Sequence, residues 1–482
     1  MAASTSNRST ARHRLPYVLG DWIMSSAAMF LYNILRYYID AEKITMQGFG
    51  SVSSFLSSSN VAIGQICFPV AMVGIFWLSG YYNNVFRKSL LQEFATTFMS
   101  TGVCMLLVFF VALINDTVID HYHNYEMLLI LWATLFVCIY PARLLTTFAI
   151  KRRIARSQVE FATLIVGCGN KAMKYAHELH QLKWKLGYRV VGFVTYDSCP
   201  PGTTADGIPV FNIDEIGTVC QRFSVTDLIV VPQSHNLDEV LHILNRLFSL
   251  NLHIKMFADE AERFLLRGRL DTLHGTPLID ISCSSLTECE TNMKRTADIL
   301  FSALALVLLS PLFAIIAVII KATDGGPIVY RQQRVGLHGK PFTIYKFRTM
   351  RTDAERDGKP MLTAVNDDRV YPFGHFMRKY RIDELLQFWN VLRGDMSIVG
   401  PRPERRYFID RIIEQAPHYT LLLQVRPGIT SLGMVKYGYA SDVAGMIRRM
   451  RYDITYIENI SFTTDLKIAI YTIWTVITGK GL

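Results

Sequence analysis

Four long apolar stretches in the first third of the chain constrain its fold more than any other feature. A bilayer core about 30 Å thick requires roughly 20 apolar residues in one helix, and each stretch is long enough to cross it. The first stretch also carries Asp21 and Arg36, which makes it the least typical of the four. The stretches are Leu15–Ile39, Val61–Tyr82, Ala95–Ile114 and Met127–Ile150. We therefore predict a membrane protein with a four-helix transmembrane bundle over residues 1–156.

The basic residues around these stretches predict their orientation. They precede the first stretch, separate the second from the third and follow the fourth, whereas the other two connections carry almost none. Because short cytoplasmic segments are enriched in Lys and Arg, both ends of the four-span unit should face the cytoplasm. A first apolar stretch followed by three more is typical of an anchor, so we expect no cleavable signal peptide. The basic residues are Arg8, Arg12, Arg14, Arg87, Lys88, Lys151, Arg152, Arg153 and Arg156.

The cysteine pattern and the net charge limit the classes of site and partner that the protein can have. The eight cysteines are scattered without a CxxC pair, so the sequence supports neither a zinc site nor a disulfide framework. The net charge of +10 is explained by the basic residues that flank membrane segments, and acidic lipid or phosphate-bearing substrates are its natural partners. We do not expect nucleic acid as a partner.

Residues 157–285 have the pattern of a Rossmann-like, doubly wound domain. Short apolar runs, "FATLIV", "YRVVGFVTYD", "VTDLIVVP" and "NLHIKMFA", alternate with helical segments such as Leu237–Phe248, which favours a parallel sheet. Gly167, Gly169 and Ala172 resemble a dinucleotide fingerprint. A tight turn that lets the strand and helix pack closely explains these residues equally well, so nucleotide binding stays open.

One alternative can be tested in this domain. Some membrane-anchored nucleotide-sugar dehydratases also join four spans to a Rossmann-like domain, and they need a Tyr-x-x-x-Lys pair. The tyrosines of this region are Tyr175, Tyr188 and Tyr196, and none has Lys four positions later. The domain is therefore interpreted as regulatory or structural.

A fifth apolar run, Ile299–Ile320, is broken at its centre by Ser310 and Pro311. A full crossing would place the Arg- and Lys-rich remainder of the chain outside the cell, against the positive-inside rule. Proline inside a helix removes one backbone hydrogen bond and bends the helix. We expect a re-entrant hairpin that enters and leaves by the cytoplasmic face, with Ser310 satisfying a freed carbonyl. An ordinary kinked fifth span remains the alternative.

Two adjacent acids, Asp383 and Glu384, lie in the segment "RIDELLQFWN". The apolar residues that follow have helical spacing, and Gly394 is a typical stop signal, so the acids are predicted in the first turn of a helix. Acids in a first turn often only complement the helix dipole. The apolar stripe consists of Ile382, Leu385, Leu386, Trp389 and Leu392.

Basic residues around this pair indicate an anionic ligand. "PFTIYKFRTM" alternates like a strand and should place Lys346 and Arg348 on one otherwise apolar face, which is costly unless an anion pairs with them. Arg378 lies five residues before Asp383, and two prolines flank Arg402 and restrict its backbone. A helix N-terminus is itself an anion-binding place.

The pattern predicts phosphoryl transfer with a carboxylate nucleophile. "GLHGK" has the wrong spacing for a Walker A loop, and we find no kinase or Ser/His/Asp hydrolase signature. A carboxylate can form an acyl phosphate, while a divalent metal and arginines neutralise charge on the transferring group.

Residues 286–482 form the predicted catalytic domain, and from about 291 they resemble the bacterial sugar transferase family, the monotopic phosphoglycosyl transferases. The motifs that carry the resemblance are "YRQQRVGLHGKPFTIYKFRTM", "RKYRIDELLQFWNVLRGDMSIVGPRPE", "RPGIT" and "YDITYIENISFTTDLKI". With the four spans and the Rossmann-like domain, the chain resembles the long form of these enzymes. That form initiates exopolysaccharide, capsule or O-antigen synthesis at the bacterial cytoplasmic (inner) membrane, with its catalytic domain facing the cytoplasm.

The resemblance implies a mechanism and its residues. Asp383 would attack the β-phosphate of a UDP-sugar, release UMP and hold the phosphosugar until polyprenyl (undecaprenyl) phosphate takes it. Glu384 would complete the dyad, and Mg²⁺ would be held by Asp383 and Glu384 in a division that stays open. The remaining implied residues are Arg378, Arg402 and Lys346 for phosphate, and Ser310 and Pro311 for the helix break. Apart from the resemblance, Arg348 and Arg426 are further candidates.

Several questions stay open at this stage. After "RPGIT" the chain reads "SLGMVKYGYA", which departs from the common family pattern, so the sugar, glucose or galactose among others, is undecided. The run "LKIAIYTIWTVITGK" fits an interfacial helix and a core helix equally. A homodimer is expected on symmetry grounds. The alternative function is a catalytically silent scaffold or nucleotide sensor, although a scaffold has no need for the intact dyad and its two arginines.

Overall fold

The computed structural model describes most of the chain, and the architecture below refers to that part. The described residues are 2–46, 48–83, 86, 88, 90–115, 121–167, 169–181, 187–195, 202–203, 207–231, 243–244, 246–248, 250, 252–257, 269–270, 278–280, 286–350, 368–438, 440 and 442–478. The chain divides near residue 160 into two compact units, and each is described by itself.

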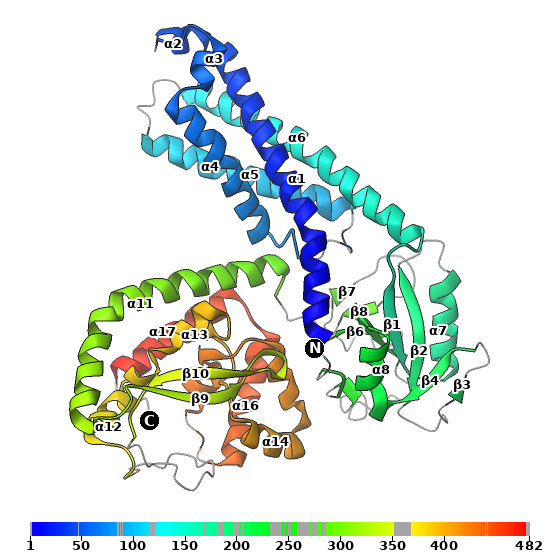
Figure 1. Cartoon of the computed structure of the whole chain (residues 1–482), viewed down its shortest axis with the longest axis vertical. Coiled ribbons are helices and arrows are strands. Elements are labelled where there is room, and N and C mark those ends of the chain that lie inside the picture. The colour runs from blue at the N-terminus through cyan, green and yellow to red at the C-terminus, as the bar shows by residue number, and fades with distance from the viewer. Residues whose placement is uncertain are drawn as a thin grey trace. The chain divides into compact units, whose positions relative to one another are not determined.

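The first unit is built from four long apolar helices (Figure 1). α1 packs against α4 and α6, and α5 packs against α6, around a core that includes Met72, Phe76 and Leu135. All four helices contain a segment long and apolar enough to cross a membrane. The helices of this unit are α1 (Ala2–Ile39), α2 (Ala41–Met46), α3 (Val52–Leu56), α4 (Ser59–Leu78), α5 (Leu90–Asn115) and α6 (His121–Ala155).

A buried ion pair explains why the first apolar stretch tolerates an acid. Asp21 of α1 accepts hydrogen bonds from Nε and Nη2 of Arg143 in α6, at 2.8 and 2.7 Å. The Tyr82 hydroxyl donates to the same carboxylate at 2.8 Å, and Arg143 Nη1 donates to Thr97 of α5 at 3.0 Å. Because charges in an apolar surrounding require such partners, this network fixes how α1, α5 and α6 face one another.

The first part of the second unit is an eight-stranded sheet in the order β3-β4-β2-β1-β5-β6-β8-β7. The five strands from β4 to β6 are parallel, whereas the pairings β3–β4, β6–β8 and β8–β7 are antiparallel. Two apolar clusters pack on the sheet, one with α7 and one with α8. The elements are β1 (Phe161–Val166), α7 (Asn170–Gln181), β2 (Tyr188–Thr195), β3 (Gly202–Thr203), β4 (Pro209–Asn212), η1 (Ile213–Glu215), α8 (Ile216–Arg222), β5 (Asp227–Val230), β6 (His253–Phe257), β7 (Arg269–Leu270) and β8 (Leu278–Asp280).

The mainly parallel sheet with helices agrees with the predicted α/β class. Most of the predicted helix Leu237–Phe248 lies outside the described residues. Gly167 ends β1 with a φ of +128°, and a Cβ placed on it would come within 2.6 Å of the Val231 carbonyl oxygen. The close approach of β1 and β5 therefore requires glycine at this position, independently of any nucleotide.

The C-terminal region begins with one long helix, α11 (Glu288–Asp324), which bends strongly in Figure 1. Pro311 lies inside it and cannot bond the carbonyl of Val307, four residues earlier. Ser310 Oγ donates to that carbonyl at 2.7 Å, as the sequence predicted. The run forms a single bent helix in which the serine hydroxyl bonds the carbonyl that proline leaves free, and its predicted re-entrant passage through the membrane stays a prediction.

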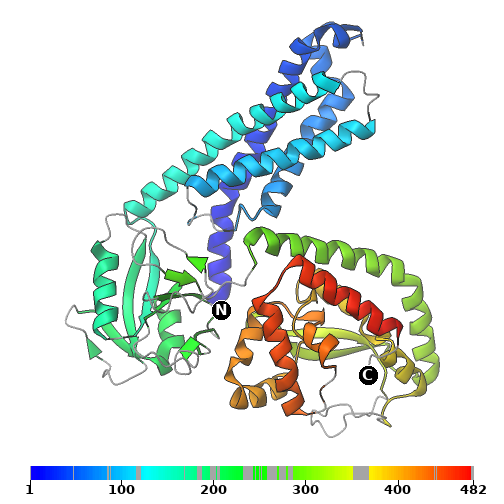
Figure 2. The same ribbon diagram turned by 180° about the vertical axis from the view of Figure 1, so that it is seen from behind.

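The two halves of α11, before and after the bend, both pack against the C-terminal domain. Before the bend, Lys294 donates to the Val399 carbonyl at 3.1 Å and pairs with Asp465 of α17, which lies beside this half in both views (Figures 1 and 2). After the bend, Ile316 and Ile320 join a cluster with Phe347. The two ends of the apolar run are therefore attached to one domain.

Two small sheets and several helices complete this region. β9 (Val329–Val335) and β10 (Pro341–Phe347) form an antiparallel hairpin, and β11 (Ser397–Val399) and β12 (Gly428–Thr430) form a parallel pair. The remaining elements are η2 (Leu337–Gly339), α12 (Pro372–Lys379), η3 (Ile382–Glu384), α13 (Gln387–Arg393), α14 (Arg406–Gln415), η4 (Pro417–Gln424), α15 (Leu432–Lys436), α16 (Val443–Glu458) and α17 (Phe462–Ile477).

The last helix, α17, exposes a broad apolar face. Ile468 is its one residue in the buried core, whereas most of its other large apolar side chains are more than half exposed. This distribution favours an interfacial helix over a core helix. The exposed residues are Phe462, Leu466, Ile470, Tyr471, Ile473, Trp474 and Ile477.

Candidate active site

The acid pair occupies a short 3₁₀ turn between two helices. α12 ends at Lys379, Arg381 adopts a left-handed conformation with a φ of 52°, and hydrogen bonds from Glu384 N to Arg381 O and from Leu385 N to Ile382 O close the turn. The predicted position in the first turn of a helix is wrong, because α13 begins only at Gln387. Gly394, with a φ of 94°, caps α13 as predicted.

Glu384 is held by three cations. Lys346 Nζ lies 2.6 Å and Arg402 Nη2 3.2 Å from its Oε1, and Arg381 Nη1 lies 3.5 Å from its Oε2. Its carboxylate is buried, which disfavours the charged form, but the three cations outweigh burial and hold the pKa of Glu384 well below its usual range. Glu384 is therefore an ionised, immobilised anchor for the cations of the site.

Asp383 has a different environment. It is buried, yet its carboxylate makes no hydrogen bond or ion pair with any residue that the structure describes. Burial raises the pKa of Asp383 to about 6, the negative charge of Glu384 adds to the rise, and Lys346 opposes it. Of two adjacent acids, one is locked by cations and the other is left available for a reaction.

The predicted phosphate-binding residues reach the dyad from separate elements. Lys346 comes from β10, and Arg402 from the loop between β11 and α14. Arg378, in the last turn of α12, donates from Nε to Thr349 Oγ1 at 2.9 Å, and its charge lowers the pKa of Asp383. The structure thus brings all three predicted cations around the acid pair.

The two further candidates are placed elsewhere. β10 ends at Phe347, so Arg348 lies just beyond the strand, where it is buried with its guanidinium against Gly326 and its amide bonded to the Ile328 carbonyl. Arg426 donates from Nε to the Gly394 carbonyl at 3.2 Å. Neither forms an ion pair with the dyad among the described contacts, and a role for either residue in the site stays a prediction.

Sequence reasoning missed Arg381. Its spacing of three residues from Glu384 was a usable signal, because residues i and i+3 of a helical turn lie on one face.

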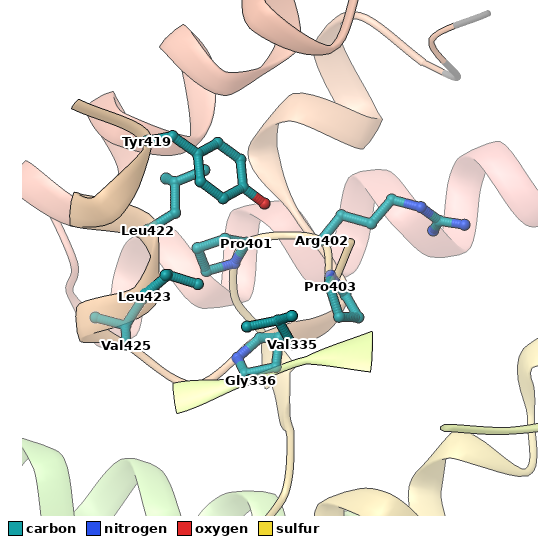
Figure 3. A pocket seen from close by; sticks show the side chains of 10 residues that line it. Val335, Gly336, Pro401, Arg402, Pro403, Tyr419, Leu422, Leu423 and Val425 are labelled. Carbon is teal, nitrogen blue, oxygen red and sulfur yellow. The ribbon is translucent and has the colours of Figure 1, made fainter. Parts of the chain in front are cut away.

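Two prolines hold the backbone at Arg402 beside an apolar crevice, and Figure 3 shows the Arg402 side chain directed away from that crevice. The crevice is lined by Val335, Gly336, Tyr419, Leu422, Leu423, Val425 and Pro427 with the segment Pro401, Arg402 and Pro403.

The donor set fits one kind of magnesium site. In the described part of the chain we find no cluster of three or more acidic, histidine or cysteine side chains able to hold a metal. Mg²⁺ commonly binds through one or two carboxylates together with substrate phosphates and water. The carboxylate of Asp383 is open to such an ion, whereas both oxygens of Glu384 already contact cations.

The fold and the site define a membrane-associated protein with an acid dyad surrounded by cations, and comparison with known proteins places it in a family. The family model for bacterial sugar transferases matches residues 289–479, and a model described as a CoA-binding domain matches residues 78–258. The chain belongs to the bacterial sugar transferase family, as predicted from its motifs.

Three relatives illustrate the similarity. The chain is 40% identical over 229 residues to the UDP-N-acetylgalactosamine-undecaprenyl-phosphate N-acetylgalactosaminephosphotransferase of Aeromonas hydrophila, covering 48% of this chain and 52% of that protein. The UDP-glucose:undecaprenyl-phosphate glucose-1-phosphate transferase of Caulobacter vibrioides is 42% identical over 188 residues, covering 38% and 70%. The Escherichia coli transferase of the same description is 31% identical over 291 residues, covering 60% and 62%. The match therefore spans only about half to three fifths of two of these relatives.

Proposed function

We propose that this protein transfers a hexose 1-phosphate from a UDP-sugar to undecaprenyl phosphate and releases UMP, through a phosphosugar bound covalently to Asp383. The observation that carries the proposal is the unequal pair of acids, with Glu384 locked by three cations and Asp383 buried without a hydrogen-bond or ion-pair partner among the described residues. The substrates named for the relatives, UDP-sugars and undecaprenyl phosphate, support the substrate classes.

In the first step, an oxygen of Asp383 attacks the β-phosphorus of the UDP-sugar. The bond between that phosphorus and the bridging oxygen breaks, and UMP leaves with the bridging oxygen. Arg378, Arg402 and Lys346 surround the position where negative charge develops, and donors fixed before the reaction stabilise that charge best. Mg²⁺ bound with the diphosphate would supply further charge neutralisation, with Asp383 as the carboxylate open to it.

In the second step, a phosphate oxygen of undecaprenyl phosphate attacks the same phosphorus. The acyl phosphate bond breaks, and the carboxylate of Asp383 is regenerated as the polyprenyl diphosphate sugar forms. Glu384 keeps its ion pairs throughout, and its role is to hold Lys346 and Arg402 in place for both steps.

The two substrates meet because the catalytic region lies at the membrane surface. The bent helix α11 is attached at both ends to one domain, which supports a re-entrant helix in the cytoplasmic leaflet of the inner membrane. The exposed apolar face of α17 supports contact with the lipid interface. This arrangement brings the phosphate of a membrane lipid and a soluble UDP-sugar to one site.

We further propose that the protein acts in the initiation of exopolysaccharide, capsule or O-antigen synthesis and forms a homodimer, the simplest closed assembly. The sugar stays open, because relatives with N-acetylgalactosamine and with glucose in their descriptions match similarly well. The segment "SLGMVKYGYA", which contains α15, departs from the family pattern in a region that we expect near the nucleotide or sugar.

The deciding experiment measures UMP release by the purified full chain. The donors are UDP-glucose, UDP-galactose and UDP-N-acetylgalactosamine, each with Mg²⁺ and with or without undecaprenyl phosphate. We expect one donor to give UMP, with a single-turnover burst when the lipid is absent, and we expect Asp383→Asn to abolish both. Asp410→Asn is the control, because Asp410 forms an exposed pair with Arg406 on α14. UMP release that persists in Asp383→Asn contradicts the role of Asp383 as the nucleophile, and no release from any donor favours the scaffold or sensor function.

A further inference from the structure

Arg402 is carried by a short segment that is fixed at both ends. On the N-terminal side, the Gly400 amide donates to the Thr430 carbonyl at 3.0 Å, and the Gly428 amide donates to the Pro401 carbonyl at 2.9 Å. A Cβ on either glycine would collide with the other strand, so this contact leaves no room for a side chain. The backbone before Arg402 is thereby held against β12.

On the C-terminal side, the anchor is the buried side chain of Glu404. Its Oε1 lies 2.5 Å from Arg449 Nη2 of α16, and its Oε2 lies 3.4 Å from Arg334 Nη1 of β9. Arg334 also donates to the Pro403 carbonyl at 3.1 Å, and the Glu404 carbonyl accepts the Val335 amide at 3.0 Å. Glu404 and its backbone are thus bonded to two elements.

These anchors determine where Arg402 can place its guanidinium. Pro401 and Pro403 restrict the backbone on both sides of Arg402, and the guanidinium lies 3.2 Å from Glu384 Oε1. Glu404 has no hydrogen bond or ion pair with Asp383 or Glu384 among the described residues, and the mechanism above does not use it. Its connection to the dyad runs through the backbone of Pro403 and Arg402.

We propose that Glu404 is a positioning residue: its buried pairs with Arg449 and Arg334 set the position from which Arg402 contacts Glu384 and the substrate phosphate. The proposal rests on the proposed function for its kinetic test. Arg449, which pairs with Glu404, also contacts the segment that departs from the family pattern: its Nη1 lies 3.8 Å from the Met434 sulfur in α15. Changes in that segment therefore act on the phosphate end of the site through Arg449 and Glu404.

The test compares Glu404→Asp and Arg402→Ala alone and together in the full chain. Aspartate keeps the charge that neutralises the two buried arginines, so the fold is retained, but it is shorter by one methylene, about 1.5 Å. Reaching Arg449 then displaces the loop and moves Arg402. We expect kcat/KM for UMP release to fall about tenfold in each single variant, the size of one charge-assisted hydrogen bond. Asp410→Asn, an exposed acid on the adjacent helix, should leave kcat/KM unchanged.

Two readouts separate positioning from a general loss of stability. If Glu404 acts through Arg402, then Glu404→Asp changes kcat/KM by less than about twofold in the Arg402→Ala background. Because Arg402 contacts the substrate phosphate in the proposed reaction, both single variants should also raise KM for the UDP-sugar, whereas a general loss of stability lowers the amount of active protein and leaves KM unchanged. Multiplicative effects, an unchanged KM or an unchanged kcat/KM in an active native chain would overturn the proposal.

An experimental structure of the Glu404→Asp variant tests the positioning role even if the protein turns over none of the donors. In an experimental structure of Glu404→Asp, Arg402 Nη2 should lie beyond hydrogen-bond distance of Glu384 Oε1 while Lys346 keeps its pair. An unchanged Arg402 contact overturns the positioning role. A displaced Arg402 in a chain whose native form releases no UMP supports positioning and rejects the proposed function.

Discussion

Lys346 Nζ lies 2.6 Å from Glu384 Oε1 and forms no hydrogen bond or ion pair with Asp383, the next residue along the chain. A lysine that faces two adjacent acids and pairs with one of them separates their functions. The paired acid is fixed as an anion, and the unpaired acid keeps a reactive carboxylate in a buried site.

The two acids should therefore differ in their effect on stability. Glu384→Gln leaves three cations without their carboxylate, and we expect a loss of about 3 kcal/mol in the free energy of unfolding, typical of breaking a buried pair. Asp383→Asn removes a buried charge that has no pairing partner among the described residues, so stability should be unchanged or higher. Thermal unfolding of both variants in one detergent compares them, and equal destabilisation would contradict the unequal environments.

Asp383→Asn should nevertheless abolish the reaction. Asparagine lacks a nucleophilic oxygen of comparable strength, and removal of a nucleophile commonly costs about 10³-fold or more. A filter-binding assay for radiolabelled phosphosugar retained on the denatured protein checks this directly. If Asp383→Asn retained the label and Glu384→Gln lost it, Glu384 and not Asp383 would be the nucleophile.

The pH dependence of the first step follows from the raised pKa of Asp383. The nucleophile must be ionised, so the UMP burst without lipid acceptor should rise with pH through about 6 and level off above it. The effect on stability has the opposite sign. Because the folded pKa lies above the unfolded value, the contribution of protonated Asp383 is complete below about 3.8 and is lost as pH rises through about 6. A burst that falls between pH 5 and pH 7 would contradict this assignment.

In the apolar unit, Arg143→Ala should be strongly destabilising. It leaves the Asp21 carboxylate buried with the Tyr82 hydroxyl as its remaining hydrogen-bond donor in the described part of the chain, and we expect a loss of about 3 kcal/mol. Combining Arg143→Leu with Asp21→Asn removes both charges and should recover part of that loss. Unfolding temperatures of the variants in detergent test the pair, and exposed Arg152 provides the control position.

Pro311→Ala should straighten α11. The alanine amide can bond the Val307 carbonyl, which Ser310 now serves, and the local cause of the bend is removed. We expect lower UMP release and a longer hydrophobic crossing. Labelling of a single cysteine placed after α11 with a membrane-impermeant thiol reagent checks the topology, because new labelling from the periplasmic side would show that the downstream segment has crossed.

Regular elements with strong local signals could be predicted from the sequence. The alternation in "PFTIYKFRTM", residues 341–350, predicted β10, although the strand ends three residues earlier at Phe347. The break at Pro311 with its serine was located correctly. The 3₁₀ turn that carries the two acids was not predicted. A 3₁₀ turn followed by a helix produces the same helical spacing of apolar residues as one continuous helix. Arginine has no preference for a left-handed backbone, so the conformation of Arg381 could not be predicted from its residue type.

The partners of the acids were harder to predict than the acids themselves. Glu384 contacts residues 38 and 18 positions away, which only the packed fold brings together. The unpaired state of Asp383 and the anchoring role of Glu404 depend on such long-range distances and have no local pattern. Motif resemblance located the site, whereas the division of roles within it required the structure.

The bend in α11 also determines where the product of the proposed reaction is left. From Ile299 to Pro311 the helix rises by about 18 Å, at roughly 1.5 Å per residue, and the chain then returns to the domain from which it started. A helix that penetrates about half of the bilayer can exchange lipid with one leaflet only. Under the proposed topology, acceptor and product would share the cytoplasmic leaflet, and any polysaccharide assembled outside the cell would require a separate protein to carry the lipid-linked sugar across.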